Sequence, residues 1–154
     1  MMNMTGKPVS DSRTVQTRLV LPPDTNHLNT IFGGKVLAYI DEMAALSAMK
    51  HAGGVVVTAS IDSVHFRSSA KVGDLLTLES FVTYTGKTSM EVYVKVEVEH
   101  VATGDRTLTT ESFLTMVAVD SDGDPKDVVP VLPESKEEIE LYESARVRRL
   151  NRKR

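Results

Sequence analysis

The sequence predicts an α+β fold in which a five-stranded antiparallel sheet wraps around one long helix. The first observation is a run from Gly34 to His51 that is apolar around nearly the whole circumference of a helix, which is typical of a buried helix. The second is the stretch from Met90 to Val98, where apolar and polar residues alternate as in a half-exposed strand. The third is the element order, namely one strand, this helix, four strands and a final helix.

The elements can be assigned in order along the chain. Residues 1–13 contain a glycine, a proline and several small polar residues, and we expect a flexible N-terminal lead-in there. A strand is predicted from Thr14 to Leu21, where two prolines end it. The long helix follows and ends near His51 at a Gly-Gly pair. His51 is expected to be a cation near the helix C-terminus.

The second half of the chain is expected to supply the rest of the sheet. Strands are predicted at residues 55–66, 75–85, 90–98 and 106–119. The first of these begins with three valines, which indicates burial on both faces. A proline-rich loop then leads to a helix that begins near Ser135, where Ser135 and Glu138 have the spacing of a capping box.

Composition limits the class of protein. The 154 residues suffice for one domain with a hydrophobic core. The absence of cysteine excludes disulfides, thiol nucleophiles and thiolate metal sites, and it fits a reducing compartment. No stretch resembles a membrane span or an export signal, so we expect a cytoplasmic protein without a membrane partner. The four histidines lack metal-ligand spacing, and we expect no metal.

Charge is distributed unevenly. The net charge is −3, and without the six basic residues among the last nine positions it would be −9. An acidic body argues against a nucleic-acid partner. The basic tail is either a solvated end or a clamp for an anionic ligand.

The long helix carries the strongest indication of chemistry. Asp41 lies on its apolar surface, and an acid there needs either a partner or a function, with Glu42 as the neighbouring alternative. Gly33 and Gly34 open the helix, where the amides lack intrahelical acceptors and the helix dipole is positive. These amides form a candidate site for an oxyanion or a phosphate. The preceding polar turn adds Asn26.

Several segments together resemble one family. The run Asp24-Thr25-Asn26, followed by Ile31-Phe32-Gly33-Gly34 and Asp41-Glu42, closely resembles the acyl-CoA thioesterases of the hotdog fold. The stretches 60–64 and 86–92 resemble later strands of the same family. The resemblance covers residues 14–120, which are therefore expected to form a single hotdog thioesterase domain. Residues 121–154 then form a loop and a C-terminal helix with the basic tail.

The resemblance implies an enzyme that hydrolyses acyl-CoA thioesters to the free acid and CoA. It implies a homo-oligomer, at least a dimer and in this branch a trimer of dimers. Asn26 of one protomer would face Asp41 of the other, and Asp41 would act as general base or as nucleophile. The amides of Gly33 and Gly34 would hold the thioester oxyanion.

The resemblance also implies where CoA binds. The residues expected to contact it are Arg67, Lys87, Thr88 and Ser89. No cofactor is expected, because CoA is part of the substrate.

Two other functions remain open from the sequence. A hotdog hydratase has an Asp-x-Asn-x-x-His pattern, which Asp24-Thr25-Asn26 begins, but position 29 is Asn and His27 comes two residues too early. A non-catalytic acyl-CoA sensor would bind CoA esters without turnover. The sequence contains no attached DNA-binding domain that would favour it.

Overall fold

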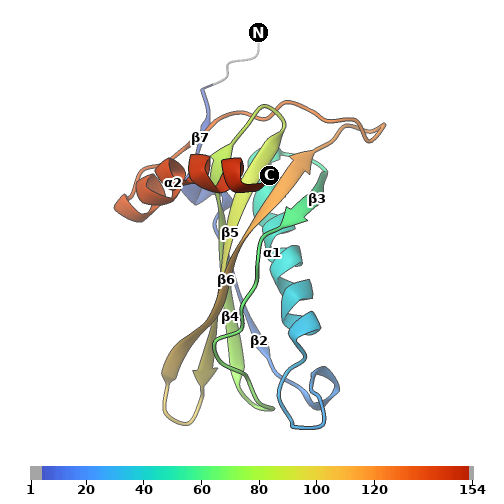
Figure 1. Cartoon of the computed structure of the whole chain (residues 1–154), viewed down its shortest axis with the longest axis vertical. Helices are drawn as coiled ribbons and strands as arrows, with labels where there is room; N and C mark the ends of the chain where they lie inside the picture. Colours follow the sequence, from blue (N-terminus) through green and yellow to red (C-terminus); the bar gives the residue numbers. More distant parts are fainter. Residues whose placement is uncertain (1–4, 153–154) are drawn as a thin grey trace.

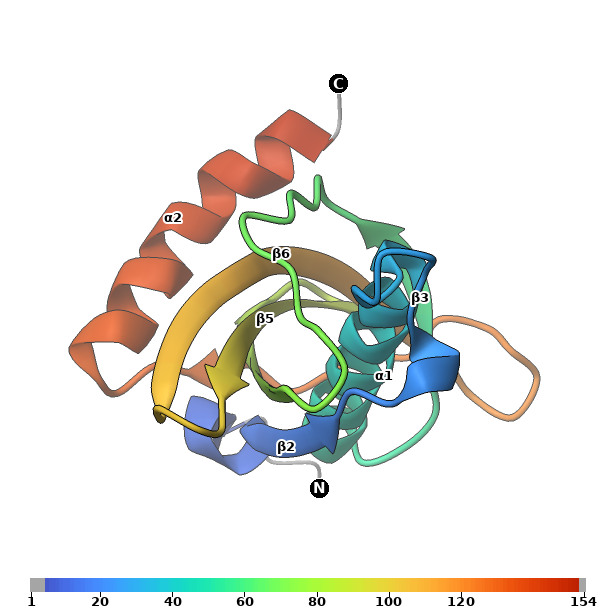
Figure 2. The same cartoon turned by 90° about the horizontal axis from the view of Figure 1, so that it is seen from below.

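The computed structural model describes residues 5–152. A five-stranded sheet curves around helix α1 (Gly33–Ala52), and helix α2 (Lys136–Arg152) lies across the outer face of the sheet (Figures 1 and 2). This arrangement confirms the predicted α+β fold and the hotdog architecture. The two helices lie on opposite faces, so the sheet separates two different environments.

All neighbouring strands of the large sheet are antiparallel. Their order is β2-β4-β5-β6-β3, so β2 and β3 form the edges. The strands are β2 (Thr14–Leu19), β3 (Val56–Ile61), β4 (Leu75–Thr85), β5 (Ser89–His100) and β6 (Asp105–Ala118). A short 3₁₀ turn, η2 (Pro22–Asp24), connects β2 to the loop before α1.

The hydrophobic core lies between α1 and the inner face of the sheet. Val92, Val94 and Val96 of β5 are completely buried there, together with Ile40 and Ala44 of α1. The alternation predicted for this strand is therefore confirmed on its inner face. On its other face Lys95, Glu97 and Glu99 are partly exposed as predicted. Glu91 and Tyr93 are not, because α2 covers that end of the strand and leaves both under a tenth exposed.

Helix α1 ends as predicted, with Gly53 in the left-handed conformation at φ 71° and its amide bonded to the Met49 carbonyl. The helix is not buried all round in the single chain. Leu37 is 36% exposed and Met49 is 45% exposed on the side that faces away from the sheet. An apolar helix face of this kind is typical of a surface that another chain covers.

The start of the chain differs from the expected flexible lead-in. Strand β1 (Lys7–Pro8) pairs in parallel with β7 (Val131–Leu132), and a 3₁₀ turn, η1 (Val9–Ser12), follows it. Val9 is fully buried, and the Ser12 hydroxyl accepts a hydrogen bond from the Val82 amide at 2.9 Å. This part is therefore anchored to the core; residues 1–4 of the predicted lead-in lie outside the described residues.

Strand β3 is shorter and more exposed than predicted. It ends at Ile61 rather than at Phe66, and it lies at the edge of the sheet. Val55 and Val57 are 63% and 47% exposed, so burial on both faces is wrong for the single chain. An edge strand with exposed valines offers unpaired backbone groups to another strand.

The capping box predicted for the last helix is confirmed. The Glu138 amide donates to the Ser135 hydroxyl, and the Ser135 amide donates to the Glu138 carboxylate, both at 3.1 Å. Residues 146–152 of the basic tail form the last turns of α2, and residues 153–154 lie outside the described residues.

His51 is a buried neutral side chain rather than the expected cation. Its Nε2 lies 2.7 Å from the Val129 carbonyl oxygen and must donate to it, since a carbonyl can only accept. Its Nδ1 is buried without a hydrogen-bond partner in the described part of the chain. Burial lowers the pKa of His51, which outweighs the opposing effect of the bond to Val129.

We expect the stability of the protein to fall as the pH drops below about 6.5, the ordinary pKa of histidine. The unfolded chain takes up a proton there, whereas folded His51 does so only at lower pH, so acid favours unfolding. Urea unfolding at pH 7.5 and 5.5 measures the effect. His51→Gln should reduce this pH dependence, and His100→Gln, at a half-exposed site, should retain it. Equal pH dependence of stability in wild type and His51→Gln would show that His51 is not the group responsible.

Candidate active site

Asp41 lies in the middle of α1, on the side toward the edge strand β3. The Thr58 hydroxyl of β3 donates a hydrogen bond of 2.7 Å to its Oδ1. Asp41 is partly exposed, and Thr58 is exposed. The carboxylate is thus held in one orientation by Thr58 and remains open to a substrate or a water molecule on its other side.

The first turn of α1 is open as the sequence predicted. No side chain caps the helix, and its first backbone bonds run from the Lys35 and Val36 amides to the Phe32 carbonyl. A methyl group added at Gly34 would meet no atom within 4 Å. At Gly33 it would lie 3.2 Å from the Phe66 ring, which borders a small pocket of about 140 Å³. The two glycine amides can therefore receive an oxyanion.

Asn26 organises the loop that precedes α1. Its Oδ1 accepts bonds from the Leu28 amide at 2.9 Å and from the amide and hydroxyl of Thr30 at 3.3 and 3.1 Å. The Phe32 amide also donates to the Asp24 carbonyl and closes the loop against the helix. With its oxygen occupied, Asn26 keeps its NH₂ group as the end that can donate to a ligand.

One chain does not bring the predicted catalytic groups together. Gly33 and Asp41 are eight residues apart in α1, roughly 12 Å at 1.5 Å per residue. A carbonyl oxygen in contact with the Gly33 amide therefore lies too far from Asp41 of the same helix for both to act on one thioester. Both groups could act on one thioester only if one of them came from a second chain, and the uncovered sides of α1 and β3 lie next to Asp41.

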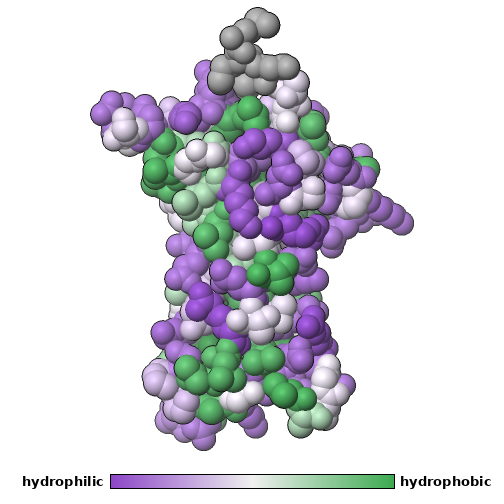
Figure 3. All heavy atoms as spheres, turned by 180° about the vertical axis from the view of Figure 1, so that it is seen from behind, coloured by the Kyte–Doolittle hydropathy of each residue, from purple (hydrophilic) through white to green (hydrophobic). Residues whose placement is uncertain are grey.

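The distribution of apolar residues on the surface is consistent with association between copies of this chain. On the back of the molecule, apolar residues gather toward the end where α1 begins (Figure 3). The exposed large apolar side chains of the loops around that end include Leu21, Leu28, Phe32 and Phe66. This clustering favours a contact surface over scattered exposure.

The residues predicted to bind CoA fall into two places. The amide of exposed Arg67 donates to the Thr109 carbonyl, whereas Ser89 pairs with Val117 at the other end of β6. Eight residues of a strand correspond to roughly 26 Å, so Arg67 and the turn with Lys87, Thr88 and Ser89 are far apart in one chain. The Arg67 guanidinium lies 3.7 Å from Glu111.

Thr58 is the site residue that sequence reasoning missed. Its only sequence signal is a hydroxyl in a strand of otherwise small and apolar residues, and which face it takes depends on a register shift between Thr58 and Ser60. Because the bulge adds one residue to the strand, Thr58 and Ser60 face opposite sides of the sheet instead of the same side. Periodicity alone therefore could not place Thr58 beside Asp41.

Residues 5–152 offer neither a candidate metal cluster nor a helix that could span a membrane. They contain no group of three or more His, Cys, Asp or Glu side chains that could hold a metal ion. None of the helices in this range is long and apolar enough to cross a membrane.

Comparisons with known proteins point to one family. A family model described as the thioesterase superfamily matches residues 28–104. The chain is 50% identical over 147 residues to an uncharacterized acyl-CoA thioester hydrolase of Bacillus subtilis, covering 94% of this chain and 86% of that protein.

Solved structures are similar over nearly the whole chain. An apo hexameric acyl-CoA thioesterase is 70% identical with a TM-score of 0.94, covering 96% of this chain and 95% of that one. An acyl-CoA hydrolase from Staphylococcus aureus, in complex with butyryl coenzyme A, coenzyme A and coenzyme A disulfide, is 46% identical with a TM-score of 0.90, covering 96% and 90%. Structures of its variants replace an aspartate, a threonine or an asparagine by alanine.

Proposed function

The chain belongs to the thioesterase superfamily, and we propose that it hydrolyses acyl-CoA thioesters with Asp41 as the catalytic carboxylate. The observation that carries the proposal is the Asp41 carboxylate, oriented by Thr58 and open to solvent on a helix whose first amides are free. An aspartate, a threonine and an asparagine are also the residue types altered in the Staphylococcus aureus variants.

In the proposed reaction, Asp41 takes a proton from water as the water oxygen attacks the thioester carbonyl carbon. The carbonyl oxygen becomes an oxyanion, which the amides of Gly33 and Gly34 of the partner subunit stabilise. The carbon–sulfur bond then breaks, and the CoA thiolate leaves and takes up the proton. The alternative is direct attack by Asp41, which gives a mixed anhydride that water hydrolyses. Neither route uses a cofactor beyond the CoA of the substrate.

The proposed active site is shared between protomers. Asp41 of one protomer faces Asn26 of the partner subunit, whose NH₂ group orients the water or the carbonyl. The 12 Å separation within one helix and the exposed edge of β3 support this arrangement. We propose a trimer of dimers as the assembly, in line with the hexameric thioesterase to which the chain is similar.

Thiol release from a panel of short-chain to long-chain acyl-CoA esters tests the proposal. The wild-type protein is expected to release CoA from at least one ester, and the panel identifies the preferred chain length. Enoyl-CoA hydration, measured on the same preparation, serves as the control for a lyase and is expected to be absent. Binding of CoA esters without thiol release from any of them would refute hydrolysis and favour a sensor.

A further inference from the structure

The pocket of about 140 Å³ beside the first turn of α1 reaches into the hydrophobic core. Its inner walls include three side chains that are at most 1% exposed, namely Val36 of α1, Ala70 of the loop before β4 and Leu76 of β4. Among the described residues that line this pocket, none carries a charge. The reaction proposed above uses the backbone at the mouth of the pocket and gives its interior no role.

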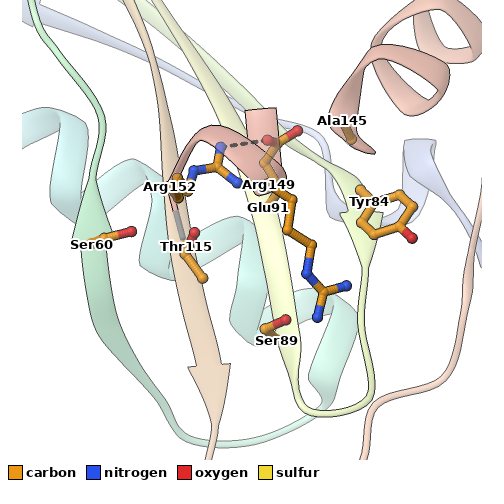
Figure 4. Close-up of a pocket in the computed structure, with 8 residues that line it drawn as sticks. All are labelled: Ser60, Tyr84, Ser89, Glu91, Thr115, Ala145, Arg149 and Arg152. Carbon is orange, nitrogen blue, oxygen red and sulfur yellow. Dashed lines mark hydrogen bonds and ion pairs between the residues drawn. The ribbon is translucent and has the colours of Figure 1, made fainter. Parts of the chain in front are cut away.

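The pocket under α2 has the opposite character. It measures about 260 Å³ and is lined by Glu91, Arg149 and Arg152 among others, with Arg152 paired to Glu91 (Figure 4). A hydrocarbon chain placed there would remove water from these charges without offering them hydrogen bonds, which is costly. An apolar ligand therefore favours the smaller pocket at α1.

The mouth of the α1 pocket adjoins the amides proposed to hold the oxyanion. Gly33 is part of the lining, and the Phe66 ring lies 3.2 Å from where a methyl group on Gly33 would be. In a thioester, the first carbon of the acyl chain is bonded to the carbonyl carbon. With the carbonyl oxygen on the Gly33 amide, that chain carbon lies within about 5 Å of the amide nitrogen. The acyl chain therefore starts at the mouth of this pocket.

The hydroxyl groups in the pocket do not oppose an apolar ligand. The hydroxyls of Ser68 and Thr109 are hydrogen-bonded to one another at 3.0 Å. A hydrocarbon chain beside them leaves this bond intact and so avoids the cost of an unpaired polar group. Ser69, the third hydroxyl residue of the lining, is exposed and is free to bind water.

Backbone hydrogen bonds fix the size of the pocket. The Ile31 amide donates to the Ala70 carbonyl, and the Arg67 amide donates to the Thr109 carbonyl, both at 2.8 Å. These bonds tie the segment 67–70 to the loop before α1 at one end and to β6 at the other. A larger ligand would have to break one of them to push this wall outward, so the volume limits what enters.

We propose that this pocket holds the acyl chain of the substrate and limits it to straight chains of about six carbons or fewer. The inference rests on the proposed function. An apolar cavity of roughly 150 Å³ holds benzene, which has six carbons, and this pocket is of nearly the same size. Each chain carbon that enters buries apolar surface and should raise kcat/KM about fourfold until the pocket is full. A longer chain leaves its end outside the pocket.

Thiol release from acetyl-, butyryl-, hexanoyl-, octanoyl- and decanoyl-CoA, measured as kcat/KM, tests the limit. In wild type, kcat/KM should rise about tenfold or more with each step up to hexanoyl-CoA and should not rise beyond it. Val36→Ala removes both γ-methyl groups from the wall and should move the maximum to octanoyl-CoA. Ala70→Val adds the same groups to the wall and should move the maximum to butyryl-CoA.

Val94→Ala is the matched control. Val94 is completely buried in the core and is not one of the described residues that line the pocket. The variant removes the same groups from the core and should lower stability while keeping the wild-type maximum. One unchanged maximum in both pocket variants, with wild-type circular dichroism, would overturn the proposal. A wild-type kcat/KM that still rises from hexanoyl-CoA to decanoyl-CoA would do so as well.

Binding measurements separate a failure of this proposal from a failure of the proposed reaction. Calorimetric titration of the same esters is carried out on Asp41→Asn, alone and combined with each pocket variant, so that affinity is measured without turnover. If wild type releases no thiol, hydrolysis is refuted, but affinity should still rise up to hexanoyl-CoA and shift with Val36→Ala and Ala70→Val. Affinities that do not depend on chain length would overturn the acyl pocket and leave the evidence for hydrolysis intact.

Discussion

Replacement of Asp41 by asparagine is expected to lower kcat for acyl-CoA hydrolysis by about 10³-fold, the range of a lost general base. Asparagine has nearly the same shape and keeps an Oδ1 that can accept the hydrogen bond from the Thr58 hydroxyl. The local geometry should therefore survive, and the loss reports the missing carboxylate charge. We expect KM to change little, since Asp41 is proposed to act on the reacting atoms rather than to bind CoA. Thiol release under saturating substrate measures the effect.

Glu42→Gln is the matched control for this variant. Glu42 is the next residue of α1, its side chain is 59% exposed, and it pairs with Arg18 at 3.1 Å. Its loss removes the same charge from the same helix and should leave kcat within about twofold, because exposed ion pairs contribute little. Full activity in Asp41→Asn, or an equal loss in Glu42→Gln, would show that the catalytic carboxylate has been misassigned. Circular dichroism and oligomer mass of both variants should match wild type.

The parts of the fold that follow from local patterns were predictable. The bounds of β4 agree residue by residue with the prediction, because turn residues flank a run of strand-forming residues on both sides. The end of α1 at Gly53 and the capping box at Ser135 depend on short-range contacts that the sequence displays directly. The uncapped amides of Gly33 and Gly34 were also predictable, because they too follow from the local sequence at the start of α1.

The features that the sequence could not predict depend on contacts between distant segments. The outer face of β5 reads as solvent-exposed because it carries Glu91, and only the packing of α2 buries that residue. The short strand β1 has too few residues for a periodic pattern, and its partner, β7, is more than a hundred residues away. The position of Arg149 beside Gly86 also results from a contact between segments that are far apart in the sequence. Each of these is a tertiary effect that overrides local propensity.

Glu91 is the residue whose loss we expect to destabilise the fold most. Its side chain is 3% exposed, and it accepts hydrogen bonds from Thr83 at 2.6 Å, from Arg148 at 2.8 Å and from Arg152 at 2.5 Å. Glu91→Gln leaves two arginines facing a neutral group, and breaking a buried ion pair in this way costs about 3 kcal/mol. Because both arginines belong to α2, this helix should lose its contact with the sheet first. Urea unfolding gives the free-energy change, and hydrogen exchange of the α2 amides locates it.

The comparison that decides this prediction is Glu99→Gln on the same strand. Glu99 pairs with Arg106 at 3.1 Å with both side chains partly exposed, and its loss should cost under about 1 kcal/mol.

The pH dependence of the stability difference between wild type and Glu91→Gln is a second test. Burial raises the pKa of Glu91, but the hydrogen bonds from Arg148, Thr83 and Arg152 outweigh it, so the pKa lies below its ordinary value of 4.5. The stability that Glu91 contributes is thus complete above that value and is lost as acid protonates it. The gap between wild type and Glu91→Gln should narrow below pH 4.5, and a gap that stays constant would show that Glu91 acts through packing rather than charge.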